Sequence, residues 1–127
     1  MTKVLLVDDE KGITTIMKMN LERTGNYQVV TENEPTLALE RALAFQPEIV
    51  ILDMVMPGMD GGDVKRQFSD HETLKDVPVI FLTALVSKDD TSPDTQLIES
   101  GDGVMIPKPV TTELLTRVID ETLSGTI

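Results

Sequence analysis

Short runs of apolar residues recur along the chain, and longer segments with polar positions separate them. The runs are residues 4–7, 27–31, 48–52, 77–82 and 104–106. They are rich in Val, Ile and Leu without regular polar alternation, which is typical of strands buried on both faces of a parallel sheet. The run at 27–31 has more polar positions, which indicates an outer place in the sheet. The pattern therefore predicts five strands.

The segments that follow these runs have apolar residues at helical spacing and end at Gly or Pro. The first has Ile13, Ile16, Met17 and Leu21 on one stripe, and Gly25 closes it. Ser92 and Pro93 have the character of an N-cap and a first helical position, so we predict a short fourth helix there. This fourth helix is predicted to cover residues 93–101. The second and third helices are predicted at residues 34–45 and 60–69. The last helix has an apolar stripe of Leu114, Leu115, Val118, Ile119 and Leu123.

Strand and helix alternate five times with short connections, which favours an α/β fold with a parallel sheet and helices on both faces. The chain has 127 residues, 40% hydrophobic and 26% charged, which is typical of a globular domain with its own core. No repeat, linker or low-complexity tract divides it. We therefore interpret residues 1–127 as one domain.

Polar side chains that could form a site lie within two residues of the ends of four runs, and each has an ordinary structural explanation. Asp9 could cap a helix, Asp53 could cap a nearby backbone N–H, Thr83 could be a turn hydroxyl, and Lys108 could be a solvated charge. The carboxyl ends of parallel strands share one edge of the sheet, where open α/β folds bind their ligands. We therefore expect one shallow pocket there, formed by Asp8, Asp9, Asp53, Thr83 and Lys108.

Over essentially its full length the chain resembles the receiver domain of two-component response regulators, the CheY-like family. The resemblance rests on the combination and order of Leu5-Leu6-Val7-Asp8-Asp9-Glu10, Leu52-Asp53, Met56-Pro57-Gly58-Met59-Asp60-Gly61, Thr83-Ala84 and Lys108-Pro109. It implies a flavodoxin-like (βα)5 three-layer sandwich whose five-stranded parallel sheet has the order 2-1-3-4-5.

The resemblance also implies a function and a metal site. Asp53 would accept a phosphoryl group from a histidine kinase, and Asp8 and Asp9 would form an acidic pocket for Mg²⁺. Crowded carboxylates repel one another, and a hard divalent cation relieves that repulsion. We assign Asp9 and Asp53 as direct ligands, Asp8 as a ligand through water, and the backbone carbonyl of Val55 as a further ligand that the family uses.

By the same resemblance Thr83 and Lys108 would sense the bound phosphate, and the Lys108–Pro109 bond is a candidate cis peptide. Met105 stands where most of the family has an aromatic switch residue, so the switch surface would depend on a flexible side chain or lie elsewhere. The segment between Thr83 and Lys108 is also longer than is usual. We hypothesise that a loop at 86–94 tunes partner choice or access to the phosphate.

The composition of the chain limits the kinds of partner that we expect it to bind. A formal net charge of −11 argues against direct nucleic-acid binding and suits divalent cations and basic partners. There is no cysteine, no apolar run of membrane-spanning length and no signal peptide pattern, so we expect a cytoplasmic protein away from the membrane. The expected partners are a sensor histidine kinase or phosphotransfer protein and a downstream effector protein or domain, with phosphorylation-dependent homodimerisation left open.

Rival functions make different demands on the same positions. A haloacid-dehalogenase-type phosphatase needs a second Asp where this chain has Val55, and flavin or dinucleotide proteins need a Gly-rich phosphate loop where this chain has Asp8 and Asp9. The alternative that remains is a pseudo-receiver that binds proteins without being phosphorylated. In neither interpretation is the chain an enzyme for an external substrate, although a receiver assists its own phosphotransfer and dephosphorylation.

Overall fold

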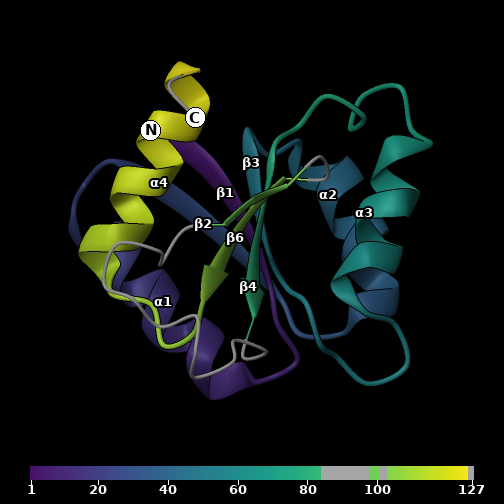
Figure 1. The fold of residues 1–127 in the computed structure, drawn as a ribbon, viewed down its shortest axis with the longest axis horizontal. Helices are drawn as coiled ribbons and strands as arrows, with labels where there is room; N and C mark the ends of the chain where they lie inside the picture. The colour runs from purple at the N-terminus through teal and green to yellow at the C-terminus, as the bar shows by residue number, and fades with distance from the viewer. Residues whose placement is uncertain (84–97, 101–102, 126–127) are drawn as a thin grey trace.

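The computed structural model describes residues 1–83, 98–100 and 103–125. Figure 1 shows a central sheet with α1 and α4 on one side and α2 and α3 on the other. The strands are β1 (Thr2–Val7), β2 (Tyr27–Glu32), β3 (Ile49–Asp53), β4 (Val79–Thr83), β5 (Ile98–Ser100) and β6 (Gly103–Pro107). The helices are α1 (Lys11–Arg23), α2 (Ala38–Phe45) after a 3₁₀ turn at Pro35–Leu37, α3 (Gly61–Ser69) and α4 (Thr112–Ser124).

The strand order across the sheet is β2-β1-β3-β4-β6-β5. The first five strands in this order are parallel, and they are the five strands that the apolar runs predict. Counted by those runs, their order is 2-1-3-4-5, so the predicted fold class is confirmed. The predicted outer place of β2 is also confirmed, because β2 forms one edge of the sheet.

The predicted end of the fourth helix is wrong. Ile98–Ser100 forms the edge strand β5, which runs antiparallel to β6 with Ser100 opposite Gly103. Pairing with the free edge of β6 therefore prevails over helix formation at 98–100. The rest of the predicted fourth helix lies outside the described residues, as does the loop at 86–94.

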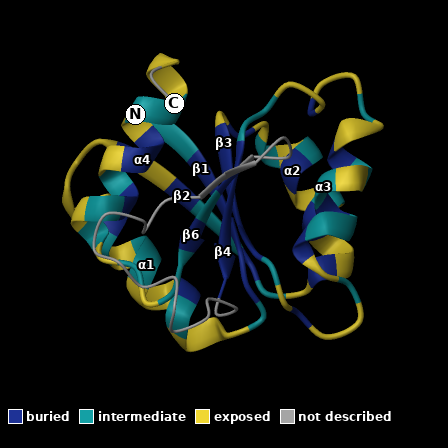
Figure 2. Ribbon diagram, viewed as in Figure 1, coloured by how far each residue is buried: buried dark blue, intermediate teal, exposed yellow. Residues whose placement is uncertain are grey.

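Both faces of the sheet are covered, which explains why the strands are continuous apolar runs. Alternate residues of a strand point to opposite faces, so Val4 and Leu6 belong to the core under α1 and α4. Leu5 and Val7 belong to the second core, under α2 and α3. All four side chains are completely buried, and Figure 2 shows exposed residues on the outer sides of the helices.

The helix ends follow the local sequence signals. Gly25 has a φ of +84°, which suits a residue without a side chain, and it closes the turn after α1 as predicted. Asp60 caps α3 through a reciprocal capping box with Asp63. The segment predicted as one helix at 34–45 begins as a 3₁₀ turn and becomes α-helical at Ala38.

Side chains hold the edge strand β2 to the helices on one face. Tyr27 is buried, and its hydroxyl donates a hydrogen bond of 2.8 Å to Asp120 Oδ1 on α4. On the same strand the backbone N–H of Val29 donates to Glu22 Oε2 on α1 at 3.1 Å. Burial and the neighbouring Asp120 raise the pKa of Tyr27 to about 12.

This shift predicts a loss of stability at high pH. A raised pKa favours the neutral phenol in the folded state. The contribution of Tyr27 to the free energy of unfolding is therefore complete below pH 10 and is lost as the pH rises towards 12. Between these pH values the wild type should lose up to about 2 kcal/mol more unfolding free energy than Tyr27→Phe, at about 1.4 kcal/mol per pKa unit. Denaturant unfolding at several pH values measures the difference, and parallel curves would contradict it.

Candidate functional site: carboxylates at the strand ends

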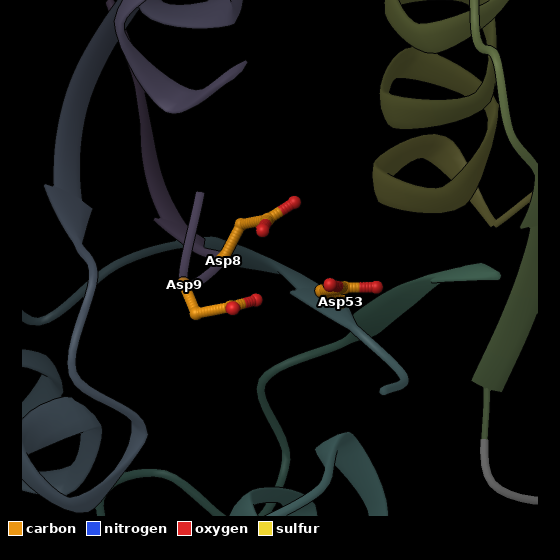
Figure 3. Close-up of side chains that lie close together, drawn as sticks. All are labelled: Asp8, Asp9 and Asp53. Carbon is orange, nitrogen blue, oxygen red and sulfur yellow. The ribbon is translucent and has the colours of Figure 1, made fainter. Parts of the chain in front are cut away.

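Three carboxylates meet at the carboxyl edge of the sheet. Asp53 is the last residue of β3, and Asp8 and Asp9 follow the end of the neighbouring strand β1. One carboxylate oxygen from each residue lies within 4.8 Å of the others, an arrangement that could hold a metal ion. Figure 3 shows Asp8 and Asp9 next to each other with Asp53 beside them. Asp8 and Asp53 are buried, whereas Asp9 is more exposed.

Lys108 reaches these carboxylates from the loop after β6. Its ammonium nitrogen lies 3.2 Å from Asp8 Oδ2 and 3.2 Å from Asp53 Oδ1. The backbone N–H of Lys108 donates to the carbonyl of Thr83 at 2.7 Å, which ties this loop to the end of β4. The Lys108–Pro109 peptide is cis, as predicted. One cation therefore bridges two of the three carboxylates.

The charges in the site influence one another. Burial and the negative charge of Asp8 raise the pKa of Asp53, although Lys108 and a hydrogen bond from the Val55 backbone act in the opposite direction. Burial alone would lower the pKa of Lys108, but the charges of Asp8 and Asp53 outweigh it and raise the pKa. The ammonium of Lys108 thus stays charged, whereas its positive charge does not fully offset the cost of burying the negative charge of Asp53 beside Asp8.

The helix-cap interpretation of Asp9 is wrong in this structure. The N-cap residue of α1 is Glu10, and no side chain makes the cap hydrogen bond. The backbone N–H of Glu10 instead donates to Asp8 Oδ1 at 3.0 Å, a local bond that holds Asp8 in place. For Asp53 the capping interpretation is partly right, because its carboxylate accepts a hydrogen bond from the Val55 backbone.

Close packing of α3 against β3 determines the path of the chain after Asp53. The backbone N–H of Gly61 donates to the carbonyl of Met54 at 3.0 Å. A Cβ atom at Gly61 would lie 2.7 Å from the Asp53 carbonyl oxygen and 3.1 Å from Met54 Cα. Both are backbone atoms that cannot rotate away, so only glycine fits between the start of α3 and the strand that carries Asp53.

We predict that Gly61→Ala destabilises the fold by about 2 kcal/mol, because overpacking forces the backbone apart. Gly12→Ala is the matched control: this helical glycine has nothing within 4 Å of an added Cβ. The control should be stabilising by about 1 kcal/mol, the usual gain when alanine replaces glycine in a helix. Thermal or denaturant unfolding compares the two variants. Equal stability of both would show that the contact at Gly61 is relieved at no cost.

Comparison with known proteins identifies the family. Residues 4–120 match the family model of the response regulator receiver domain. The chain belongs to the response regulator receiver family. The receiver is 35% identical over 107 residues to the alkaline phosphatase synthesis transcriptional regulatory protein PhoP of Bacillus subtilis, a match that covers 84% of this chain and 42% of PhoP. It is 34% identical over 108 residues to the response regulator PleD of Caulobacter vibrioides, covering 85% of this chain and 23% of PleD.

Solved structures show the same relationship. The chemotaxis protein CheY4 of Vibrio cholerae superposes with a TM-score of 0.79 at 26% identity, covering 95% of this receiver and 98% of CheY4. The signal receiver domain of a signal transduction histidine kinase from Syntrophus aciditrophicus gives a TM-score of 0.78 at 28% identity, covering 98% of this receiver and 92% of that domain. Family membership removes the phosphatase and the flavin or dinucleotide protein from the alternatives.

The receiver spans less than half the length of PhoP and about a quarter of PleD. None of its described helices is long and apolar enough to cross a membrane.

The acidic cluster of the receiver offers the hard oxygen ligands that Mg²⁺ prefers, and three carboxylates facing one lysine leave an excess of negative charge that a divalent cation would offset. The chemistry of the donor set therefore fits the metal that receivers typically bind.

The other residues expected at the site are placed as follows. Thr83 is buried at the end of β4, where it pairs with Pro107 of β6. Val55 is 56% exposed in the loop after β3. Met105 is partly buried on the α2 and α3 side of the sheet, where it packs against the core that contains Phe81.

The structure also places Asn33 beside the acidic cluster, although the sequence analysis did not predict it as a site residue. Its side-chain amide donates hydrogen bonds to the carbonyl of Asp8 and to Thr14 Oγ1. Asn33 follows β2 directly and so sits at a strand end, like the other site residues. Its position at the carboxyl end of a strand, the signal that indicated Asp53 and Lys108, would therefore also have indicated Asn33.

Proposed function

We propose that this receiver accepts a phosphoryl group on Asp53 from the phosphohistidine of a kinase or phosphotransfer protein, in a reaction that depends on Mg²⁺. The observation that carries the proposal is the position of the Asp53 carboxylate. It lies within 4.8 Å of the carboxylate oxygens of Asp8 and Asp9, and 3.2 Å from the ammonium of Lys108. A nucleophile thus stands between a candidate cation site and a fixed positive charge.

In the proposed reaction an oxygen of ionised Asp53 attacks phosphorus and the P–N bond to histidine breaks. The product is an acyl phosphate on Asp53, and the bonding electrons leave with the imidazole nitrogen. Phosphoryl transfer depends mainly on positioning and electrostatic stabilisation, so Lys108 has a direct part in it. Its ammonium would move from Asp53 to an oxygen of the transferred group while it stays paired with Asp8.

Mg²⁺ bound by Asp9 and Asp53, with Asp8 through water and the Val55 carbonyl, would neutralise charge on the phosphoryl oxygens. The surroundings of Asp8 and Asp9 suit them to bind the cation in different ways. Asp8 is buried and held by the N–H of Glu10, so it keeps its place when the cation enters. Asp9 is more exposed and would exchange contact with solvent for contact with the ion.

Signalling would follow when the phosphoryl group stabilises one of two conformations of the protein. Thr83 would donate its hydroxyl to a phosphoryl oxygen, and the loop bearing Lys108 would move with it because their backbones are hydrogen-bonded. We infer that Met105 repacks within this movement in place of an aromatic side chain. The exposed Val55 side chain would hinder the water that hydrolyses the acyl phosphate.

We infer that residues 1–127 form one receiver domain that acts with a sensor histidine kinase or phosphotransfer protein and an effector protein or domain. The names of the relatives support this, since PhoP is a transcriptional regulatory protein and PleD a response regulator. Cytoplasmic location and phosphorylation-dependent dimerisation stay predictions.

Intact mass spectrometry after incubation with acetyl phosphate, with and without Mg²⁺, tests the proposal. One phosphoryl adduct that needs Mg²⁺, mapped to the peptide containing Asp53, is the expected result. An Mg²⁺ titration followed by amide shifts in ¹H–¹⁵N NMR spectra accompanies it. Mg²⁺ binding without any adduct would favour the pseudo-receiver, and failure of both would contradict the metal site as well.

A further inference from the structure

Asn33 connects the end of β2 to two other elements of the receiver. Its Nδ2 donates to the backbone carbonyl of Asp8 at 2.9 Å and to Oγ1 of Thr14 at 2.9 Å. The Asp8 carbonyl can only accept, and the hydroxyl of Thr14 is itself donated to the carbonyl of Lys11 at 3.1 Å. Both partners therefore require a donor, so the NH₂ group rather than the amide oxygen must face them.

Thr14 provides a firm anchor for this contact. It is 1% exposed, and its hydroxyl is fixed within the first turns of α1 by the bond to Lys11. The other side of the connection is also rigid, because the N–H of Asp8 donates to the carbonyl of Glu32 at 3.2 Å and so continues the sheet. Asn33 thus joins β2, the segment after β1 and α1 at one point.

The Asp8 carbonyl belongs to the peptide group that leads into Asp9. Rotation of this peptide would swing the Asp9 side chain, and the hydrogen bond from Asn33 opposes that rotation. Asp8 has bonds of its own, to the N–H of Glu10 and to Lys108. Within residues 1–83, 98–100 and 103–125 the carboxylate of Asp9 makes no hydrogen bond or ion pair. Its direction therefore depends on the backbone that Asn33 holds.

We propose that Asn33 is a positioning residue for Asp9 and, through Asp9, for the Mg²⁺ site. Asn33 does not contact the ion; it fixes the peptide from which a ligand extends. The inference rests on the proposed function, because it takes Asp9 as a ligand. Groups that orient metal ligands typically change metal affinity by about 10- to 100-fold when they are removed.

The test is an Mg²⁺ titration of wild type, Asn33→Ala, Asn33→Asp and Thr14→Val, followed by the amide signals of Asp9 and Asp53 in ¹H–¹⁵N NMR spectra. Thermal unfolding without Mg²⁺ accompanies each titration. We expect Asn33→Ala to raise the Mg²⁺ dissociation constant about tenfold. Thr14→Val removes only the anchor on α1, so it should lower the unfolding temperature but weaken Mg²⁺ binding much less than Asn33→Ala does.

Asn33→Asp gives an answer that does not depend on the folding of Asn33→Ala. It keeps the size of the side chain but has no donor, and its added negative charge by itself would strengthen cation binding. Weaker binding in this variant therefore supports positioning, because the added charge alone acts in the opposite direction.

The remaining outcomes separate this inference from the proposed function. Unchanged affinity in Asn33→Ala, with Mg²⁺ binding and phosphorylation intact in the wild type, overturns the role of Asn33 alone. If the wild type itself shows no Mg²⁺-dependent shifts, the metal site and the role of Asn33 both fall.

Discussion

Asp53→Asn is expected to abolish the phosphoryl adduct that acetyl phosphate forms on the wild type in the presence of Mg²⁺. The amide keeps the size of the side chain but lacks the anionic oxygen that attacks phosphorus. It also removes one of the three carboxylates that meet within 4.8 Å, so Mg²⁺ binding should weaken at the same time. Intact mass spectrometry measures the adduct, and NMR titration measures the affinity for Mg²⁺.

Two comparisons make this result specific. Asp76→Asn makes the same chemical change at an exposed position outside the site and should be phosphorylated like the wild type.

The stability of Asp53→Asn provides the second comparison. Since burial and Asp8 raise the pKa of Asp53, its neutral form is favoured in the folded state at low pH, and this advantage is lost as the pH rises. Asp53→Asn should therefore be at least as stable as wild type at neutral pH without Mg²⁺.

An adduct of undiminished yield on Asp53→Asn would show that another residue accepts the phosphoryl group. A variant that is markedly less stable than wild type in EDTA would contradict the charge imbalance inferred for the site. The first outcome concerns the identity of the nucleophile, and the second concerns its electrostatic surroundings.

Lys108→Ala is expected to slow phosphorylation by acetyl phosphate about 100-fold at saturating Mg²⁺, the usual cost of losing one group that stabilises transition-state charge. Among the described residues, Lys108 is the cation that pairs with both Asp8 and Asp53. Its side chain is only 20% exposed, so water replaces its charge poorly. The time course of adduct formation by mass spectrometry gives the rate.

The same variant should not lose affinity for Mg²⁺. In the absence of metal the ammonium of Lys108 occupies the carboxylates that would bind the cation, so its removal takes away a competitor. Lys75→Ala is the matched control, because it removes one positive charge at a surface pair with Glu72 and should leave the rate unchanged. A Lys108 variant with wild-type rate, or a loss of rate equal in both variants, would contradict the role proposed for Lys108.

Local sequence determined much of this fold because the relevant signals lie within single elements. A strand buried on both faces must be apolar at every position, and the runs that form β1 and β3 meet that demand. The cap at Asp60 and the turn at Gly25 also depend on neighbouring residues alone. The position of Asp53 after such a run then placed it at the carboxyl edge, since all parallel strands end there.

Tertiary pairing decided what the local pattern could not. Residues 98–100 were predicted to be helical, yet they extend because the edge of β6 offers a row of free backbone groups. The local pattern of residues 98–100 gives no account of this pairing, because it depends on a partner strand that another segment provides. The close approach of α3 to β3 at Gly61 has the same origin, since it arises from packing between two elements.

The sequence by itself therefore determined the five strands and the strand-end positions of the residues in the acidic cluster, because each follows from composition and period within one segment. The family followed from the combination and order of motifs along nearly the whole chain. Only the tertiary structure decided how these residues engage one another: Lys108 bridging Asp8 and Asp53, and Asn33 holding the peptide before Asp9. Those contacts join residues up to 100 positions apart in the chain. Their geometry is fixed by the sheet that brings the segments together rather than by any one segment.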